Sequence, residues 1–279
     1  IVRAADLIAA HAQERPAVLL AGPSGSGKTT TALLIERELD RRGMETHTLS
    51  MDDYFCPLTE RELELFSRNE LDLERPSRVD VPFFQEQLGK LLAGEEVELP
   101  HYDFKNSVRV FDGRTLRRRP GELVILEGIH ALNDVIVGKN PKAFKLYIAA
   151  RSNVVDEDGA VVFQHPWLRL CRRIVRDYKF RGSDANFTLK MWPNVRRGEK
   201  LYISPYKENA DLMFDSSLPD EVAVLKPFVV PLLEALPQGK YEIADDILRG
   251  FERIEIMEES NIAPSSLVRE FIGGSSFKY

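Results

Sequence analysis

Eight residues near the N-terminus have the types and spacing of a phosphate-binding loop. Residues 22–29 read Gly-Pro-Ser-Gly-Ser-Gly-Lys-Thr, which satisfies the pattern G-x-x-x-x-G-K-[ST]. Glycines let the backbone point successive N–H groups into one concavity, and a helix that follows adds partial positive charge. Lys28 would supply a mobile cation and Thr29 a hydroxyl for Mg²⁺. The expected nucleotide-binding residues are Gly22, Pro23, Ser24, Gly25, Ser26, Gly27, Lys28, Thr29 and Thr30.

Carboxylates follow two apolar runs of the sequence. Asp52 and Asp53 come after residues 44–51, and Glu127 follows residues 123–126. Ligands of parallel sheets bind at the carboxyl ends of the strands, where a carboxylate can accept a hydroxyl proton or orient Mg²⁺. The alternatives are helix capping for Asp52 or Asp53 and an ordinary surface acid at a strand end for Glu127.

A helix predicted over residues 167–180 is rich in arginine. Arg169, Arg172, Arg173 and Arg176 are spaced by three and four residues, so most of them share one helix face. Such a row can clamp a phosphoryl group during its transfer. The alternative is that they are surface arginines in salt bridges.

The elements that must position these side chains follow from the apolar runs. Ala17–Ala21 predicts a buried strand, residues 30–41 a helix, and residues 44–51 a second strand. Strand, turn, helix and strand make the βαβ unit of a parallel sheet. We expect a preceding helix over 4–13 and further buried strands at 123–126 and 145–149.

The remaining segments give weaker patterns. Residues 59–79 are charged and irregular and are interpreted as part of an inserted, substrate-facing region, before a helix over 82–93. Asp112-Gly113 predicts the turn of a hairpin between residues 108–110 and 115–119. A helix over 221–236 is expected to be interrupted by its two prolines, and residues 243–256 to be partly helical.

Composition excludes several classes of protein. The 279 residues include 38 Lys and Arg against 44 Asp and Glu, so the net charge of -6 argues against a dedicated nucleic-acid binder. Cys56 and Cys171 are too few for a disulfide framework and favour a reducing compartment. Apolar runs are far shorter than the roughly 20 residues of a membrane span. We expect a cytoplasmic protein without nucleic-acid or membrane partners. Whether it forms a homo-oligomer stays open.

Several motifs, taken in order, resemble the uridine kinase/phosphoribulokinase family of P-loop kinases. They are the loop at 22–29, Ser50-Met51-Asp52-Asp53-Tyr54-Phe55, Leu99-Pro100-His101-Tyr102-Asp103-Phe104, Leu126-Glu127-Gly128-Ile129 and Arg172-Arg173-Ile174-Val175-Arg176-Asp177. Residues 174–182, 191–199, 223–227 and 269–274 are similar to the bacterial two-domain nucleoside kinases. In those kinases a threonyl-tRNA-synthetase-like region precedes the kinase. This sequence begins at Ile1 and not at Met, which we interpret as the boundary of a fragment, so sequence before it is expected to be missing here.

The resemblance implies a fold and a division of the chain. The fold is the α/β P-loop kinase fold, a parallel sheet flanked by helices, with an inserted acceptor-binding region and an Arg-rich lid. Residues 1–236 would form the kinase domain, and 237–279 a C-terminal helical extension with a flexible tail.

The resemblance also implies roles for single residues. Asp52 would be the general base, Lys28, Arg176 and Arg181 would act on the phosphates, and Thr29, Asp52 and Glu127 would surround Mg²⁺. The nucleoside would contact Asp52, Tyr54, Glu74, Tyr102, Phe104 and Arg173, with Glu74 on the ribose hydroxyls. Ser107 and Met191 stand where a pyrimidine-specific uridine kinase carries His and Gln, so we expect looser discrimination between bases.

The expected reaction is transfer of the γ-phosphoryl group of ATP, as Mg·ATP, to the 5′-hydroxyl of a ribonucleoside. Two alternatives stay open. One is a kinase of another sugar or sugar phosphate, as in phosphoribulokinase. The other is a nucleotide-binding regulator without an acceptor, although the N-K-x-D signature of GTPases does not occur in the sequence.

Overall fold

Short apolar runs form a five-stranded sheet at the centre of the fold. The computed structural model describes residues 1–68, 70–104, 106–138 and 142–279. The strand order is β2–β5–β1–β6–β9, and β1 pairs in parallel with both β5 and β6, as β2 does with β5. The strands are β1 (Ala17–Ala21), β2 (Thr46–Ser50), β5 (Leu123–Gly128), β6 (Ala143–Ala149) and β9 (Leu212–Asp215). The predicted parallel α/β sheet is confirmed.

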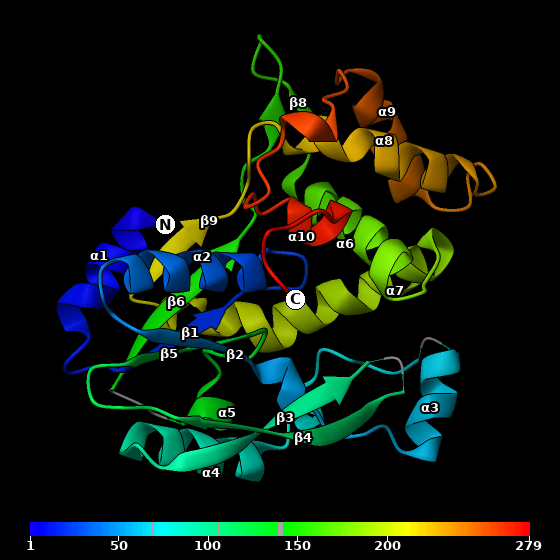
Figure 1. The fold of residues 1–279 in the computed structure, drawn as a ribbon. Helices are drawn as coiled ribbons and strands as arrows, with labels where there is room; N and C mark the ends of the chain where they lie inside the picture. The colour runs from blue at the N-terminus through cyan, green and yellow to red at the C-terminus, as the bar shows by residue number, and fades with distance from the viewer. Residues whose placement is uncertain (69, 105, 139–141) are drawn as a thin grey trace. The chain divides into compact units, whose positions relative to one another are not determined.

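Two helices cover one face of this sheet. They are α1 (Val2–His11) and α2 (Lys28–Arg41), and Figure 1 shows both on the same side. Ala5, Ile8 and Leu39 pack with Val18 and Ile125 in a buried cluster. Every residue of β1 and β5 is buried, as expected of parallel strands covered on both faces. The predicted helix at 30–41 begins two residues earlier, directly at Lys28.

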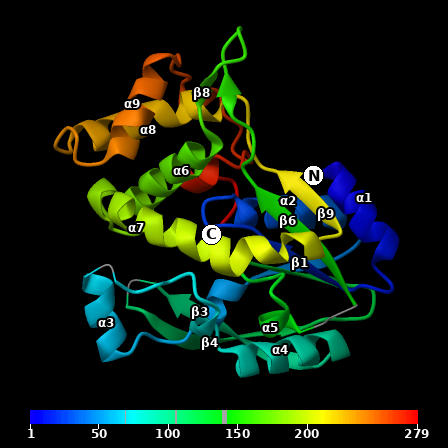
Figure 2. The ribbon, with the colours of Figure 1, turned by 180° about the vertical axis from the view of Figure 1, so that it is seen from behind.

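The segment between β2 and β5 carries the inserted elements. They are η1 (Met51–Tyr54), α3 (Glu60–Ser67), η2 (Pro76–Arg78), α4 (Val81–Ala93), β3 (Glu96–Asp103) and β4 (Val108–Arg117). Figure 2 shows the β3–β4 hairpin lying along α4. The prediction that residues 59–79 are irregular is wrong for α3. Its N-terminus has a capping box in which the Thr59 hydroxyl accepts from the Glu62 N–H and the Glu62 carboxylate from the Thr59 N–H.

The predicted hairpin around Asp112-Gly113 is also wrong. β4 runs through both residues and pairs with β3, so the turn lies between Asp103 and Val108. The pairing register shifts between Glu98 and Pro100 on β3, opposite this dipeptide, and Gly113 has a φ of 80°. The dipeptide therefore forms a bulge, a second structure that a glycine with positive φ favours.

The second half of the chain is mainly helical. Its elements are α5 (Asp134–Val137), β7 (Val154–Val155), β8 (Val161–Phe163), α6 (His165–Phe180), α7 (Ala185–Gly198), η3 (Glu199–Ile203), η4 (Ser204–Asn209), α8 (Glu221–Glu234), α9 (Glu242–Glu252), η5 (Glu259–Asn261) and α10 (Arg269–Ile272). The expected interruption of α8 by Pro227 and Pro231 is wrong. Pro227 has no N–H for the Ala223 carbonyl, and that carbonyl accepts from the Met257 N–H instead.

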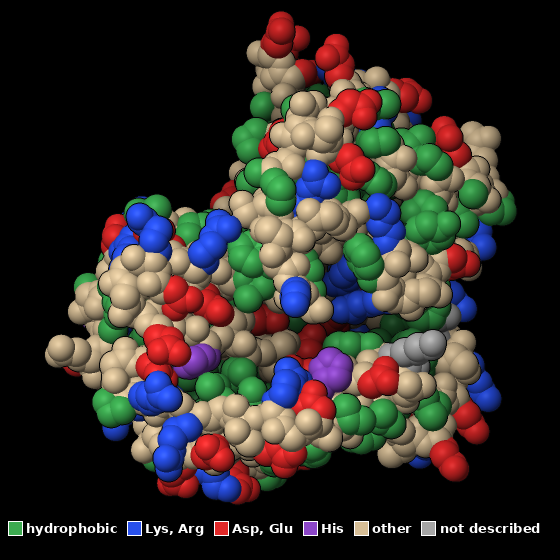
Figure 3. All heavy atoms as spheres, in the orientation of Figure 1, with side chains coloured by type: hydrophobic (Ala, Val, Ile, Leu, Met, Phe, Trp, Pro, Cys, Tyr) green, Lys and Arg blue, Asp and Glu red, His purple; other side chains and the backbone are tan. Residues whose placement is uncertain are grey.

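The described chain forms two compact units. The first comprises residues 1–23, 31–148 and 195–214, and the second residues 24–30, 149–194 and 215–279. A boundary after residue 236 stays a prediction. Among the described residues, every helix is too short or too polar to cross a bilayer. On the face drawn in Figure 3, basic side chains are interspersed with acidic ones, in keeping with the small net charge.

Candidate active site

The glycine-rich loop has the backbone that its sequence requires. Gly25 and Gly27 have φ angles of 75° and 80°, in the left-handed region that glycine adopts without strain. A Cβ on Gly27 would also stand 2.5 Å from Cδ1 of Leu267. Conformation and space therefore both require glycine at Gly27.

The loop and the helix after it offer donors to an anion. Lys28 and Thr29 open α2, a 14-residue helix whose first-turn N–H groups have no partner within the helix. The Ser26 hydroxyl oxygen is buried and makes no hydrogen bond with any described residue. A buried hydroxyl beside a helix N-terminus suits a phosphate oxygen, so these residues fit the triphosphate that the motif implies.

Arginines of α6 hold the first half of the loop. Arg169 donates to the Ser24 carbonyl at 3.0 Å, and Arg172 donates to the Gly25 carbonyl at 3.0 Å. Arg173 donates to the Ser24 hydroxyl. Arg172 is also fully buried in an ion pair with Glu221, at 2.5 Å from Nε to Oε1. Arg169 and Arg172 thus support the backbone of the loop, and Arg173 holds its Ser24 side chain. A contact between Arg173 and the nucleoside stays a prediction.

The two predicted lid arginines, Arg176 and Arg181, lie beside Asp177. Arg176 Nη2 lies 2.7 Å from Asp177 Oδ1, and Arg181 Nε lies 4.0 Å from the same oxygen. Burial raises the pKa of Asp177, but Arg176, Arg173 and Arg181 outweigh it and bring the pKa down to about 2. The carboxylate is therefore ionised at neutral pH and keeps positive charge gathered at the end of α6.

The C-terminal residues contact the first turn of α2. The Glu270 carboxylate accepts from the Thr30 N–H at 3.2 Å and from the Thr30 hydroxyl at 2.6 Å. The Tyr279 hydroxyl lies 2.9 Å from the same Thr30 oxygen, and Figure 1 shows the end of the chain beside the loop before α2. One orphan donor of the helix is thus bonded by an acid that sequence analysis did not select.

Parallel pairing brings the predicted carboxylates to one edge of the sheet. Ser50 at the end of β2 and Leu20 of β1 are both register partners of Glu127. The Ser50 hydroxyl accepts from the Asp52 N–H at 3.3 Å and so begins the turn that carries Asp52. Asp52, Glu127 and the start of the loop at Gly22 therefore leave the sheet at the same edge. Their oxygens are the hard ligands that Mg²⁺ prefers.

Asp53 is engaged with the hairpin. Its Oδ1 accepts from the Tyr102 N–H at 2.9 Å and lies 3.3 Å from Nδ1 of His101. Burial raises the pKa of Asp53, although the Tyr102 N–H opposes that shift. Asp53 therefore ties η1 to β3.

The aromatic residues predicted at the acceptor differ in exposure. Tyr54 is buried against Phe84, and Tyr102 is buried with its hydroxyl 3.3 Å from Arg78 Nη2. Phe104 is 46% exposed and meets Tyr102 edge to face at 5.2 Å. Of these three rings, Phe104 offers the accessible surface for stacking.

Glu74 is 7% exposed, which is unusual for an acid. Its backbone N–H donates to Asp72 Oδ1 at 3.1 Å. Asp72 Oδ2 lies 3.3 Å from Nη2 of Arg197. The predicted ribose-binding acid therefore stands next to the end of α7.

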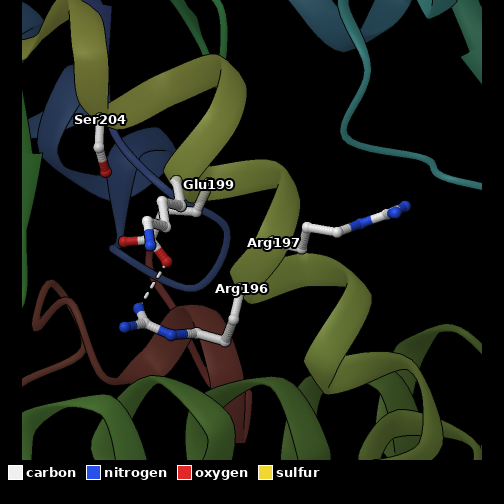
Figure 4. A pocket seen from close by; sticks show the side chains of 5 residues that line it. Arg196, Arg197, Glu199 and Ser204 are labelled. Carbon is white, nitrogen blue, oxygen red and sulfur yellow. Dashed lines mark hydrogen bonds and ion pairs between the residues drawn. The ribbon is translucent and has the colours of Figure 1, made fainter.

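A cavity of about 460 Å³ lies at the end of α7 and the turns after it. None of its lining residues was predicted as a site residue from the sequence. It is lined by Arg196, Arg197, Glu199, Lys200 and Ser204. Figure 4 shows Arg196 turned toward Glu199, to which it donates at 2.6 Å, and Arg197 pointing away. Arg196 is paired with Glu199 and Arg197 with Asp72, so neighbouring acids balance both arginines. The signal in the sequence is the three basic residues within 196–200.

Known proteins resemble this chain over most of its length. Residues 18–223 match the Phosphoribulokinase / Uridine kinase family. Uridine kinase of Lactobacillus helveticus is 29% identical over 76% of this chain and 92% of its own length. Uridine kinase of Staphylococcus haemolyticus is 31% identical over 74% of this chain and 89% of its own length. The solved structure of the YGR205w protein has 20% identity and a TM-score of 0.50, covering 76% of this chain and 89% of that one, and it supports the fold alone.

Proposed function

Because this chain belongs to the phosphoribulokinase/uridine kinase family, we propose that it transfers the γ-phosphoryl group of Mg·ATP to the 5′-hydroxyl of a ribonucleoside. One observation carries the proposal. Asp52, Glu127 and the first residue of the phosphate-binding loop all lie at the same edge of the parallel sheet. Relatives that are named uridine kinases support the nucleoside as acceptor.

The chemical step divides the tasks among these groups, and Asp52 has two of them. Asp52 accepts the proton of the 5′-hydroxyl while the oxygen forms its bond to the γ-phosphorus. The bond from that phosphorus to the bridging oxygen breaks, and ADP leaves with the electron pair. Lys28, Arg176 and Arg181 stabilise the negative charge that develops on the phosphoryl oxygens. Thr29, Asp52 and Glu127 would hold Mg²⁺, which neutralises charge on the phosphates.

Recognition of the acceptor follows from Glu74 and Phe104. A carboxylate can accept two hydrogen bonds at once, so Glu74 would bind the two hydroxyls of the ribose. The exposed Phe104 ring stacks on any base, because every base has an aromatic face. Ser107 and Met191 bring little to read a base edge, so purine nucleosides are also accepted in this proposal.

The finer family assignment belongs to the same proposal. The stretches at 191–199 and 269–274 support kinship with two-domain nucleoside kinases, in which a threonyl-tRNA-synthetase-like region precedes the kinase.

The cytoplasm is the proposed compartment of the reaction. Cys56 and Cys171 are free thiols, which supports a reducing compartment.

A panel of acceptors tests the proposed function. ADP release from Mg·ATP is measured with uridine, cytidine, adenosine, guanosine, inosine, 2′-deoxyuridine and ribulose 5-phosphate. We expect stimulation by several ribonucleosides and little by the deoxynucleoside or the sugar phosphate. Stimulation by ribulose 5-phosphate alone would instead assign a sugar-phosphate kinase, and no stimulation by any acceptor would favour a nucleotide-binding regulator.

A further inference from the structure

The last residue of α7 touches the acid that is proposed to bind ribose. Gly198 has φ -61° and ψ -42°, ordinary helical angles at which any residue is comfortable. A Cβ placed on it would stand 2.4 Å from Cβ of Glu74 and 2.9 Å from Cγ. Atoms of that kind do not approach so closely, and Glu74 Cβ is fixed to its backbone. Space, and not backbone conformation, therefore requires glycine at this position.

A second contact joins the same two segments. Asp72 accepts from the Glu74 N–H through Oδ1 and binds Arg197 through Oδ2, at 3.1 and 3.3 Å. Oδ1 of Asp72 also lies 3.5 Å from the position of a Cβ on Gly198. Asp72 thus fixes the backbone of Glu74 against the two residues that end α7. Both contacts therefore tie the position of Glu74 to this end of the helix.

We propose that Gly198 is a positioning residue that sets the place of the Glu74 carboxylate, and through it the preference for ribonucleosides over 2′-deoxynucleosides. The inference rests on the proposed function, because it takes Glu74 as the partner of the ribose hydroxyls. Hydrogen bonds weaken steeply once distance and angle leave their narrow range. A displacement of Glu74 therefore removes the advantage that the 2′-hydroxyl gives, while the phosphate-binding loop is untouched.

Gly198→Ala tests the proposal, and Gly89→Ala is its matched control. Gly89 lies inside α4, and a Cβ on it would meet no heavy atom within 4 Å. Both changes put Ala for Gly in a helix, so they share the gain in helix propensity and differ in the contact. For Gly198→Ala we expect kcat/KM for the ribonucleoside to fall about 10-fold or more, because a misplacement of ~1 Å can cost that much. The ratio of kcat/KM for the ribonucleoside to kcat/KM for the 2′-deoxynucleoside should fall as well, and KM for ATP should be unchanged. Gly89→Ala should change none of these three quantities.

A double variant separates positioning from a general structural effect. In a Glu74→Gln background the carboxylate is already lost, so adding Gly198→Ala should lower the ribo-to-deoxy ratio no further. If Gly198→Ala does not fold, Arg197→Ala removes the contact to Asp72 without adding an atom, and it should lower the same ratio.

The outcomes separate the two proposals. A Glu74→Gln variant that keeps its preference for ribonucleosides would remove Glu74 from the ribose and with it this inference. If Glu74→Gln lowers the preference but Gly198→Ala and Arg197→Ala do not, only the positioning role is overturned. If Gly198→Ala raised KM for ATP and lowered kcat/KM equally for the ribonucleoside and the deoxynucleoside, the positioning role would also be contradicted.

Discussion

Asp52 and Asp53 are neighbours in one short turn, and their surroundings give them different tasks. Asp53 accepts the Tyr102 N–H and anchors the hairpin. Within the described residues, the Asp52 carboxylate accepts no hydrogen bond, and the residue is held by its backbone: its N–H donates to Ser50 and its carbonyl accepts from the Phe55 N–H. A base must have a lone pair available to the hydroxyl it deprotonates. Among the described residues, both oxygens of Asp52 meet that condition, whereas Oδ1 of Asp53 is engaged with the hairpin, so Asp52 is the better placed base.

Asparagine at each position separates these tasks. Asp52→Asn should lower kcat by about 100-fold with ATP affinity retained, because it removes the proton acceptor and keeps the shape. Asp53→Asn keeps an oxygen for the Tyr102 N–H, so its kcat should stay within a few-fold of the parent. Turnover and ATP binding are measured for both variants. A larger loss of kcat in Asp53→Asn would show that the base has been assigned to the wrong acid.

Single residues were predictable where one local pattern determines them. The loop at 22–29 could be identified because its spacing alone defines the phosphate cradle, and Gly25 and Gly27 have the positive φ angles it needs. Gly198 and Asp72 could not be identified in this way. Their importance comes from contacts with Glu74, a residue whose nearness to α7 no local pattern encodes.

At the scale of the element, α6 is fixed to α8 by a buried ion pair. Arg172 and Glu221 are both fully buried, and two guanidinium nitrogens reach the two carboxylate oxygens. Glu221→Ala should lower the free energy of unfolding by about 3–5 kcal/mol, because it leaves the Arg172 charge buried without its partner. Asp246→Ala breaks the exposed pair with Arg249 and should cost at most about 1 kcal/mol. Urea unfolding of both variants measures the difference, and equal losses would contradict this account.

The Arg cluster at the end of α6 makes stability depend on pH. The pKa of Asp177 is about 2 in the folded protein, below the value of about 3.9 for an unfolded aspartate. A depressed pKa contributes stability above the unfolded pKa, on the order of 2 kcal/mol here, which is lost as pH falls from about 4 toward 2.

The Asp177→Asn variant isolates that contribution. The difference in unfolding free energy between the parent and Asp177→Asn should be constant above pH 5 and shrink between about pH 4 and 2. Chemical unfolding across this range measures it. A difference that does not change with pH would mean that Asp177 gains nothing from the arginines.

The boundaries of an element could be predicted where one local conformational preference acts alone. The predictions were wrong where a contact with a distant segment overrides that preference. Asp112-Gly113 favours a tight turn, yet pairing of β4 with β3 places it in a bulge. Pro227 lacks an N–H, yet α8 continues because Met257 satisfies the free Ala223 carbonyl. In both cases a distant strand or loop supplies what the local sequence lacks. The helix α3 could have been found, since Thr59 and Glu62 have the spacing of a capping box.

At the scale of the whole molecule, residues far apart in sequence complete the start of α2. Glu270 binds both the N–H and the hydroxyl of Thr30. Glu270→Ala should lower the free energy of unfolding by about 1–2 kcal/mol, the cost of losing a helix cap. Glu255→Ala, at an exposed position, is the control and should cost less than about 0.5 kcal/mol. Thermal unfolding of both variants decides, and equal midpoints would mean that the Glu270 contact contributes nothing.

Transfer of labelled phosphate tests the central claim most directly. The protein is incubated with Mg²⁺, ATP labelled at the γ-phosphorus and a ribonucleoside, and the products are separated and their phosphorylated position is determined. We predict label in the nucleoside 5′-monophosphate, with one ADP formed for each, and loss of nearly all transfer in a folded Lys28→Ala variant. Label that appears only as inorganic phosphate, or full transfer by Lys28→Ala, would contradict the assignment of this chain as a nucleoside kinase.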